Sequence, residues 1–280
     1  MGPIDPMQAV QHTPLVVSDY AWEEVAGKEP TAWYLDPLVA AQKRVLNAEL
    51  VRKALDGPVR LALKTDTFEE ACGDDSPMPN LRLLAGTWLA MDRAFGMVQR
   101  ARQRMPALEC LTADVRSLPF RTGSLDLVFS NSTLDHFRTR PEFEAAVQEI
   151  ARILRPRGKL IVTLDNSLNP TYWLLRVLSK TRRAPFPLGY APSPSALRKA
   201  LDQADFNIVT TGVMIHNPRV LSTLLYILLR RLLGRRADKP TGAFLAAFQW
   251  LDWLPSRHVT ACFITAAAVR RAETNGRYHG

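Results

Sequence analysis

The chain has 280 residues, 47% of them hydrophobic, and its formal net charge is +9. This length suits one domain with room for an insertion, and the apolar content is ample for a large core. The basic residues do not form a long tract with interleaved aromatic side chains, so we expect an arginine-rich soluble enzyme rather than a nucleic-acid-binding protein.

The three cysteines bear on whether the protein binds a metal and on the compartment in which it works. Cys72, Cys110 and Cys262 form no Cys-x-x-Cys pair and have no histidine at metal-ligand spacing. We therefore expect reduced core thiols and no metal site. The chain does not begin with a basic stretch followed by an apolar one, so the expected location is the cytoplasm.

Residues 1–56 are predicted to form an N-terminal arm and helices. Four aromatic residues either pack the arm onto the domain or form a lid over a site, and these roles are compatible: Tyr20, Trp22, Trp33 and Tyr34. A helix is predicted from Pro37 to Leu55, ended by Gly57 and Pro58. Its apolar stripe is Leu38, Ala41, Val45, Leu46, Leu50 and Leu55.

Residues 57–217 alternate between apolar strands and amphipathic helices. Strands are predicted at 59–66, 82–91, 107–114, 125–130, 159–164 and 207–215. Helices are predicted at 67–73, 93–104 (with Phe95, Val98 and Ala101 inward), about 143–154, 172–179 and from Ser195 onward. The third of these is expected to stop at Pro156 and Gly158. The fourth and fifth strands are near-continuous apolar runs, as expected for strands covered on both faces of a parallel sheet.

The most specific pattern lies between Leu111 and Asn166. It begins with Asp-x-x-x-Leu-Pro-Phe at 114–120 and reaches Ser-Asn-x-x-Leu-x-His at 130–136 after a buried strand. A helix follows, and then Arg-x-Leu-x-Pro-x-Gly-Lys at 152–159. These elements, in this order and spacing, resemble the class I S-adenosylmethionine-dependent methyltransferases of the small-molecule type.

The resemblance implies an α/β, Rossmann-like fold with residues 57–217 as the cofactor-binding core. A seven-stranded sheet would carry helices on both faces, with a helical insertion before the last strand. That closing strand is predicted at 258–271, antiparallel between the fifth and sixth strands. The implied cofactor is S-adenosylmethionine.

Cofactor contacts are implied at the carboxyl ends of the strands, where open α/β sheets bind ligands. Asp92 would accept both ribose hydroxyls, Asp114 would accept a hydrogen bond from the adenine amino group, and the Val115 N–H would serve an adenine ring nitrogen. For Asp92 a helix cap is the alternative role. The other candidate cofactor-binding residues are Lys64, Thr65, Asp66, Arg93, Ser130 and Asn131.

The first turn departs from the family pattern. The sequence Lys-Thr-Asp-Thr-Phe-Glu-Glu-Ala-Cys-Gly at 64–73 stands where a glycine-rich turn would let the backbone approach the cofactor. Either Thr65, Asp66 and Glu70 replace those backbone contacts, with a carboxylate meeting the cofactor's amino group, or the site no longer supports methyl transfer. Capping of the following helix is the alternative role of Asp66.

Candidate catalytic residues follow the fourth strand. Asn131 ends that strand, below the expected position of the methyl group, and Asp135 and His136 begin the next turn. Histidine accepts protons near neutral pH, so His136 is a base or a packing residue beside the cofactor. Asp126 is expected to be structural. Beyond the fifth strand, Asp165, Asn166 and Tyr172 either contact substrate or form the loop.

Residues 218–256 form a hydrophobic insertion whose apolar run, Leu224 to Leu229, is too short to span a bilayer. Three interpretations stay open. The insertion caps a pocket with Phe244, Phe248, Trp250 and Trp253 in its wall, it pads the sheet edge, or residues 218–255 contact a membrane peripherally with arginines at the headgroups. Residues 257–280 would supply the closing strand and a C-terminal tail.

The expected activity is S-adenosylmethionine-dependent methyl transfer to a hydrophobic small molecule: a polyketide, terpenoid, lipid or lipid-linked sugar. Oxygen is the first choice of acceptor atom. Because the donor is already activated, the protein mainly has to align the nucleophile and exclude water. The alternatives are a nucleic-acid or protein methyltransferase and a binding protein that does not transfer the methyl group.

Overall fold

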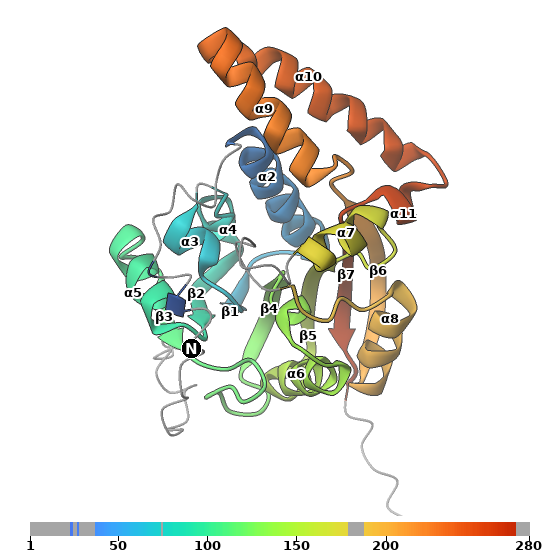
Figure 1. Cartoon of the computed structure of the whole chain (residues 1–280). Helices are drawn as coiled ribbons and strands as arrows, with labels where there is room; N and C mark the ends of the chain where they lie inside the picture. The colour runs from blue at the N-terminus through green and yellow to red at the C-terminus, as the bar shows by residue number, and fades with distance from the viewer. Residues whose placement is uncertain (1–22, 25–26, 28–36, 74, 179–187, 273–280) are drawn as a thin grey trace, which may run out of the picture.

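The computed structural model describes residues 23–24, 27, 37–73, 75–178 and 188–272 (Figure 1). The aromatic residues predicted to form a lid lie outside these ranges. One seven-stranded sheet has the order β3-β2-β1-β4-β5-β7-β6, with β7 antiparallel to both of its neighbours. The predicted α/β fold and the placement of the closing strand are therefore confirmed. The strands are β1 (Val59–Lys64), β2 (Ala85–Asp92), β3 (Glu109–Thr112), β4 (Leu125–Asn131), β5 (Leu154–Asp165), β6 (Phe206–Met214) and β7 (Phe263–Arg270).

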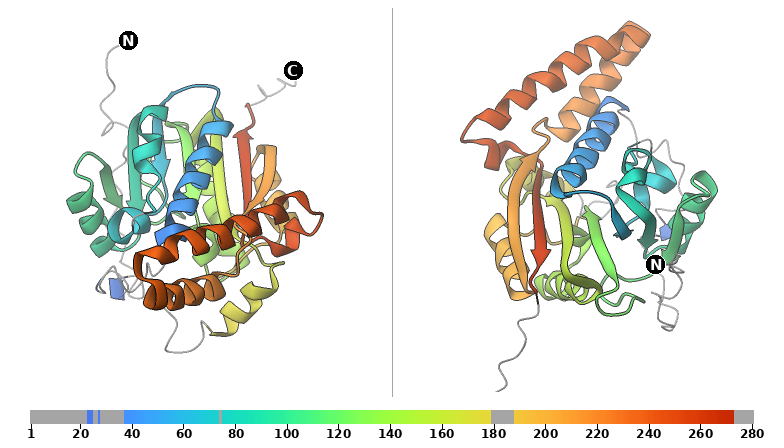
Figure 2. Two further views of the ribbon diagram at one scale, coloured as in Figure 1. Left: turned by 90° about the horizontal axis from the view of Figure 1, so that it is seen from above. Right: turned by 180° about the vertical axis from the view of Figure 1, so that it is seen from behind.

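Helices cover both faces of the sheet (Figures 1 and 2). The main ones are α2 (Pro37–Ala54), α3 (Phe68–Cys72), α4 (Met78–Leu81), α5 (Phe95–Arg104), α6 (Arg140–Ile153), α7 (Pro170–Leu178), α8 (Pro194–Gln203), α9 (Arg219–Leu233), α10 (Asp238–Gln249) and α11 (Arg257–Thr260). Short 3₁₀ turns are η3 (Arg82–Leu84), η4 (Leu134–His136), η5 (Gly234–Ala237) and η6 (Trp250–Trp253).

Strand β1 shows how the two faces are filled. Leu61 and Leu63 point into a core that includes α6 and α8, whereas Ala62 points into a second core with α2, α4 and α5. This follows the two-residue period of a strand, and both faces are buried, as expected for the parallel strands of an α/β sheet.

Helix α6 shows where local chemistry sets an element's bounds. Thr139 and Glu142 form a capping box at its start. Its end differs from the prediction, because the helix stops at Ile153 and Leu154 already belongs to β5. The ring of Pro156 disfavours helical backbone in the residue before it, so the chain turns extended early and Leu154 pairs with Leu125.

Other boundaries also moved. Residues 82–84 form η3, so β2 begins at Ala85, and residues 258–260 are helical, so β7 begins at Phe263. Val45 and Phe95, both expected to face inward, are 47% and 51% exposed. The buried residues of α2 are instead Ala40, Asn47, Ala48 and Val51.

Asp126 is structural, as predicted. Its Oδ2 accepts hydrogen bonds from the backbone N–H groups of Arg60 (3.1 Å) and Leu61 (2.8 Å), and its Oδ1 lies 2.8 Å from Nε of Arg155. It sits near the start of β4 and therefore at the amino end of the parallel strands. The three cysteines are buried, and none of them forms a disulfide within the described residues.

Candidate functional site

A cavity of about 200 Å³ opens at the carboxyl ends of the parallel strands. Most of the residues predicted to form the site line it: Thr65, Asp66, Asp92, Arg93, Asp114, Val115, Asn131, Asp135 and His136. Lys64 and Ser130 do not line it. The structure therefore brings most of the predicted site residues together around one cavity, while Lys64 and Ser130 lie behind its wall.

Asp92 accepts three hydrogen bonds from the two chain segments beside it. Its Oδ2 accepts from the backbone N–H (3.0 Å) and the hydroxyl (3.1 Å) of Thr67, and its Oδ1 accepts from the Ala94 N–H (2.9 Å). Burial raises the pKa of this carboxyl, and the hydrogen bonds oppose that rise. The carboxylate is thus fixed in the cavity wall, and Oδ1 retains a lone pair for a ligand hydroxyl.

Asp114 is held by arginine. Arg116 donates to both of its carboxylate oxygens, with Nη2 2.6 Å from Oδ2 and Nε 3.0 Å from Oδ1, and Nε of Arg93 lies 3.4 Å from Oδ2. Burial alone would raise the pKa of Asp114, but the bonds and charge of Arg116 lower it. This carboxylate therefore stays ionised in the cavity wall, an acceptor of fixed orientation.

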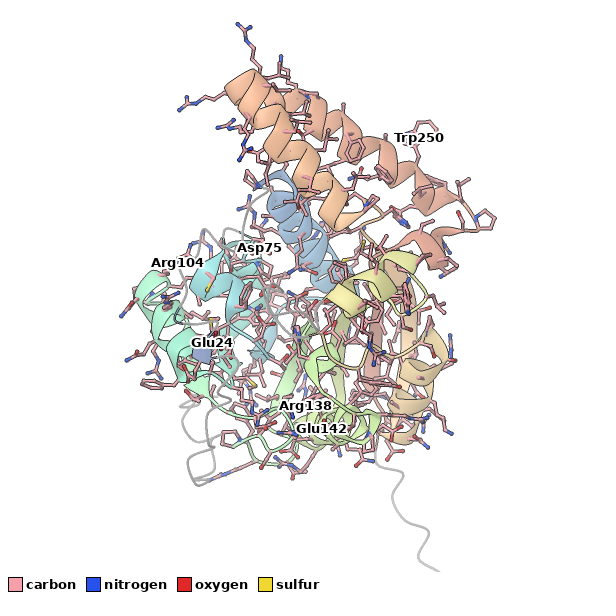
Figure 3. All side chains as sticks on the ribbon, in the orientation of Figure 1. Glu24, Asp75, Arg104, Arg138, Glu142 and Trp250 are labelled. Atoms are coloured by element: carbon pink, nitrogen blue, oxygen red, sulfur yellow. The ribbon has the colours of Figure 1, made fainter. Side chains whose placement is uncertain are left out.

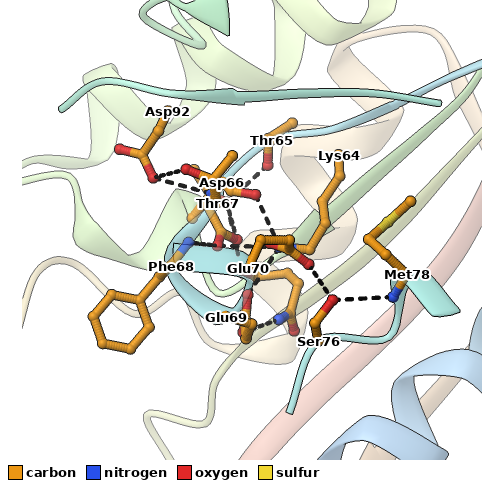
Figure 4. Close-up of polar contacts among 12 residues, drawn as sticks. Lys64, Thr65, Asp66, Thr67, Phe68, Glu69, Glu70, Ser76, Met78 and Asp92 are labelled. Atoms are coloured by element: carbon orange, nitrogen blue, oxygen red, sulfur yellow. Dashed lines mark hydrogen bonds and ion pairs between the residues drawn. The ribbon is translucent and has the colours of Figure 1, made fainter. Parts of the chain in front are cut away.

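The glycine-poor turn is built on a buried lysine (Figure 4). The Nζ of Lys64, whose side chain is fully buried, lies 2.8 Å from Glu69, 2.9 Å from Glu70 and 3.2 Å from Asp66. The prediction that Lys64 contacts the cofactor is therefore corrected, because its ammonium group is paired with these carboxylates inside the wall. Glu70 lies behind the wall as well, where it also accepts from Ser76.

These carboxylates resemble a metal site, since one oxygen from each of Asp66, Glu69 and Glu70 lies within 4.8 Å of the others. The Lys64 ammonium, however, sits within 3.2 Å of all three. A cation is thus already supplied by the chain itself.

Two residues that sequence reasoning missed complete this end of the cavity. Lys43 of α2 and Glu69 of α3 both line it, with Nζ and Oε1 2.9 Å apart. Asp75, labelled in Figure 3, lies 3.5 Å from the same Nζ. Lys43 precedes its partner by 26 residues, and only the packing of α2 on the sheet brings them together.

The net charge of this end is negative. Four carboxyl groups (Asp66, Glu69, Glu70 and Asp75) share two ammonium groups. Burial, followed by the charge of Glu69, raises the pKa of Asp66 well above its usual range. An additional positive group in the cavity would relieve this repulsion, so this end suits a cationic ligand group.

The floor of the cavity is held by side-chain amides and hydroxyls. The Asn131 amide donates to Oε1 of Glu69 (2.5 Å), and its Oδ1 accepts from Thr163 (2.7 Å). Ser130 is fully buried and accepts from the Thr65 hydroxyl (3.0 Å). Ser130 therefore supports Thr65 from behind rather than facing a ligand.

Asp135 has one carboxylate oxygen that is held and one that is not. Its Oδ2 accepts from the backbone N–H of Asp165 (2.6 Å), whereas Oδ1 is buried and has no hydrogen-bond partner in the described part of the chain. Burial and then the charge of Asp165 raise the pKa of Asp135 to about 6. A carboxylate with that pKa and a spare oxygen in a cavity wall can accept a proton near neutral pH.

A close backbone approach fixes the η4 turn that carries Asp135 and His136. A Cβ on Gly189 would lie 2.4 Å from the carbonyl oxygens of Asp135 and Phe137, so only glycine fits there. The Tyr190 N–H donates to the Phe137 carbonyl (2.6 Å), and the Tyr172 hydroxyl donates to the Gly189 carbonyl (3.0 Å). Tyr172 thus braces the turn.

Asn166 serves the loop rather than the cavity. Its Nδ2 donates to the carbonyls of His258 and Ala261, both at 2.9 Å, and Asn169 donates to Thr260 (2.8 Å) and Ala261 (2.9 Å). The two amides tie the loop after β5 to the chain entering β7. Of the residues considered beyond the fifth strand, Asp165 lines the cavity.

The predicted cap does not cover this cavity. Helices α9 and α10 project away from the sheet domain (Figures 1 and 2), and no described residue of 218–256 lines the cavity. Phe244 and Phe248 pack on each other with ring centroids 4.9 Å apart, while Trp250 and Trp253 are 77% and 88% exposed. In the described structure the insertion therefore does not form a wall of this cavity, because the leucine-rich helix pairs with α10 instead of folding back.

Comparison with known proteins finds methyltransferases. A family model described as a methyltransferase domain matches residues 68–162. A tRNA (carboxymethyluridine(34)-5-O)-methyltransferase of Xenopus tropicalis is 35% identical over 74 residues, which cover 26% of this chain and 12% of that protein. A malonyl-[acyl-carrier protein] O-methyltransferase of Yersinia pestis is 31% identical over 94 residues, 34% of each chain. The chain thus matches about a third or less of the length of its curated relatives.

Solved structures extend the likeness over most of the fold. An S-adenosylmethionine-dependent methyltransferase of Thermotoga maritima superposes with a TM-score of 0.58 at 14% identity, covering 90% of this chain and 99% of that one. At this identity the likeness shows the fold alone.

Proposed function

Because the chain belongs to the class I S-adenosylmethionine-dependent methyltransferases, we propose that it transfers the methyl group to an oxygen of a hydrophobic small molecule. S-adenosylmethionine, when bound, supplies a methyl group already activated on sulfonium. What the chain has to add is binding, alignment and exclusion of water. The observation that carries the proposal is the gathering of Asp92, Asp114 and the acidic cluster around one cavity at the carboxyl edge of the sheet.

The residues along the cavity wall are of types that suit the successive parts of the cofactor. Asp92 offers acceptor oxygens to the ribose hydroxyls, while Asp114 and the Val115 N–H offer an acceptor and a donor to adenine. At the other end, Asp66 and Glu69 form an electronegative wall that suits the α-ammonium group, and Lys43 suits the α-carboxylate. Side-chain ion pairs would thereby replace the missing glycine turn.

Two observations support an oxygen atom as the methyl acceptor. The names of the two curated relatives described above specify O-methylation. Phe137 and Phe263 line the cavity close to Asp135 and Asp165, which gives an apolar wall beside a proton acceptor. We propose that Asp135 accepts the proton, with His136 lining the same wall and Asn131 holding Glu69 in place.

A nucleic-acid substrate is the second candidate, favoured by the net charge of +9 and the tRNA-modifying relative. Retention on immobilised tRNA across a salt series separates the two candidates. Steep, salt-dependent retention would favour RNA, and elution at low salt would favour the small molecule.

Calorimetric titration with S-adenosylmethionine and S-adenosylhomocysteine tests the cofactor assignment. Asp92→Asn keeps the shape of the side chain but offers one fewer acceptor oxygen, so we expect the affinity for both ligands to fall by roughly tenfold or more. The control is Glu109→Gln, which changes an exposed acid at the start of β3, at the end of the strand away from the cavity. This variant should bind as the wild type does. Equal affinities in the two variants would refute the ribose role of Asp92.

The pH dependence of binding tests the acidic end. Because burial raises the pKa of Asp66, its carboxyl holds a proton more tightly than an ordinary aspartate and becomes a better partner for a cation as pH rises. We therefore expect the S-adenosylmethionine affinity to increase with pH, below the titration of the ligand's own amino group. Asp66→Asn should bind more weakly with a flatter profile, and an unchanged pH slope in Asp66→Asn would contradict the assignment.

A further inference from the structure

The α9–α10 hairpin carries an exposed apolar face with no counterpart in the fold. Leu221, Leu224, Leu228 and Leu232 are spaced by three, four and four residues, so they share one side of α9. Each is between 53% and 70% exposed. The opposite side of α9 holds the buried Ser222 and Tyr226. Four aligned leucines in water form a continuous patch of the kind that marks an interaction site.

Basic charge gathers on the same hairpin. Residues 218–256 contain six basic and two acidic residues, a net charge of +4 out of the chain's +9. Both acids are engaged internally, Asp238 with Arg230 (3.3 Å) and Asp252 with His216 (2.7 Å). Arg231, Arg235 and Arg236 at the turn are exposed, and no carboxylate of the described chain pairs with them. An apolar stripe beside arginines complements the two layers of an anionic lipid surface, acyl chains and phosphate headgroups.

Aromatic and apolar side chains extend this face toward the domain. Trp250, at the end of α10, is 77% exposed and is labelled in Figure 3, and Trp253 is 88% exposed. Helix α7 lies near the base of the hairpin (Figures 1 and 2) and exposes Trp173, 70%, and Leu174, 52%. Tryptophan favours the boundary between headgroups and acyl chains, because its ring is apolar and its N–H is polar.

The hairpin leaves the sheet at the edge where the cavity opens. Met214, the last residue of β6, pairs with Phe263 of β7, and Phe263 pairs with Asp165 at the end of β5. Phe263 and Asp165 both line the cavity. A surface that received the hairpin would thus lie on the cavity side of the molecule. Among the described residues no helix is both long and apolar enough to cross a membrane, which leaves contact along its surface.

We propose that the α9–α10 hairpin docks on an anionic membrane surface, with the α9 leucines entering the acyl boundary and the arginines at the phosphates. The site of methyl transfer then faces the membrane, so the acceptor class is a lipid or a lipid-linked molecule. This consequence for the substrate rests on the proposed methyl transfer, whereas docking itself does not. A membrane explains both the leucines and the arginines, whereas RNA would leave the leucines in water.

Vesicle co-sedimentation of the full chain tests docking. One set of vesicles is phosphatidylcholine alone, and the other contains about 30% phosphatidylserine. We expect binding to the second set, weakened by salt, and little binding to the first. Leu224→Ser/Leu228→Ser and Arg235→Glu/Arg236→Glu should each bind roughly tenfold more weakly or worse. All four positions are exposed, so the variants should fold.

Matched controls separate docking from general charge attraction. Leu83→Ser changes a leucine that is 77% exposed next to the start of β2. Arg60→Glu reverses an exposed charge at the start of β1. Both positions lie at the amino ends of the parallel strands, whereas the cavity lies at their carboxyl ends. Both controls should bind vesicles as the wild type does. Absence of vesicle binding, equal losses in controls and hairpin variants, or a dimer in solution that the leucine variants dissociate would each overturn the proposal. Competition by tRNA that the arginine variant abolishes, without vesicle binding, would identify RNA as the partner instead.

The cofactor titration keeps the two proposals apart. Hairpin variants should retain the wild-type affinity for S-adenosylhomocysteine, because no described residue of the hairpin lines the cavity. Vesicle binding without cofactor binding would support docking and refute the proposed function. Cofactor binding without vesicle binding would be consistent with the proposed function and would refute docking.

Discussion

Replacing Lys64 with methionine should lower the free energy of unfolding by about 3–5 kcal/mol, the usual cost of removing one partner from a buried ion cluster. The Lys64 ammonium lies within 3.2 Å of Asp66, Glu69 and Glu70. Methionine fills a similar volume, so the loss reports charge rather than a cavity. Urea unfolding followed by circular dichroism measures it.

The pH dependence of this loss follows from the carboxyl groups left behind. Burial already raises the pKa values of Asp66 and Glu70, and the charge of Lys64 opposes that rise in both. Without Lys64 their folded-state pKa values climb further. A raised pKa stabilises the fold below the unfolded value and loses that contribution as pH rises through the folded value. The deficit of Lys64→Met should therefore be largest near neutral pH and shrink toward about pH 4.

Lys53→Met is the matched control. Its side chain is 71% exposed and pairs with Glu49 along α2 at 3.0 Å. Exposed pairs of this kind contribute about 0.5 kcal/mol or less, so the control should stay within that range. A loss below about 1 kcal/mol in Lys64→Met, or a deficit that grows on acidification, would show that the cluster is not held together by charge.

The sequence predicts the fold well because its signals are local and repeated. Apolar strands alternate with amphipathic helices, and Asp92 and Asp114 follow strands whose carboxyl ends meet at one edge. Side chains that depend on packing between distant elements could not be found in this way. Lys43 reaches Glu69 only through the packing of α2, and no residue near Lys43 announces that contact.

The two misplaced predictions share a physical cause. Lys64 follows an apolar strand at the family's cofactor turn, so it reads as a ligand contact until its three buried carboxylate partners are seen. The leucine pattern of 219–233 shows that α9 has an apolar face. Periodicity does not reveal which surface covers that face, and here the fold leaves it exposed.

Asp135→Asn should lower methyl transfer by about 10²–10⁴-fold if the acceptor is a hydroxyl group, the usual contribution of a general base. The Asp135 carboxyl has a pKa of about 6 because it is buried beside Asp165. Wild-type kcat/KM should therefore rise with pH through about 6 and level off above it. Transfer from labelled S-adenosylmethionine to an alkylphenol measures the rate, and a carbon NMR titration of the carboxyl groups checks the pKa without an acceptor.

Two further variants separate a base from a residue that only shapes the wall. Asp165→Asn removes the neighbouring charge that raises the pKa of Asp135. The rise of kcat/KM with pH (the acid limb) should therefore move to lower pH, while the value at high pH is largely kept. Asp135→Asn should lose that limb yet bind S-adenosylhomocysteine as the wild type does. If His136→Gln erased the limb while Asp135→Asn kept it, the imidazole would be the base. If transfer to the alkylphenol were unaffected by either change, neither side chain would be the general base.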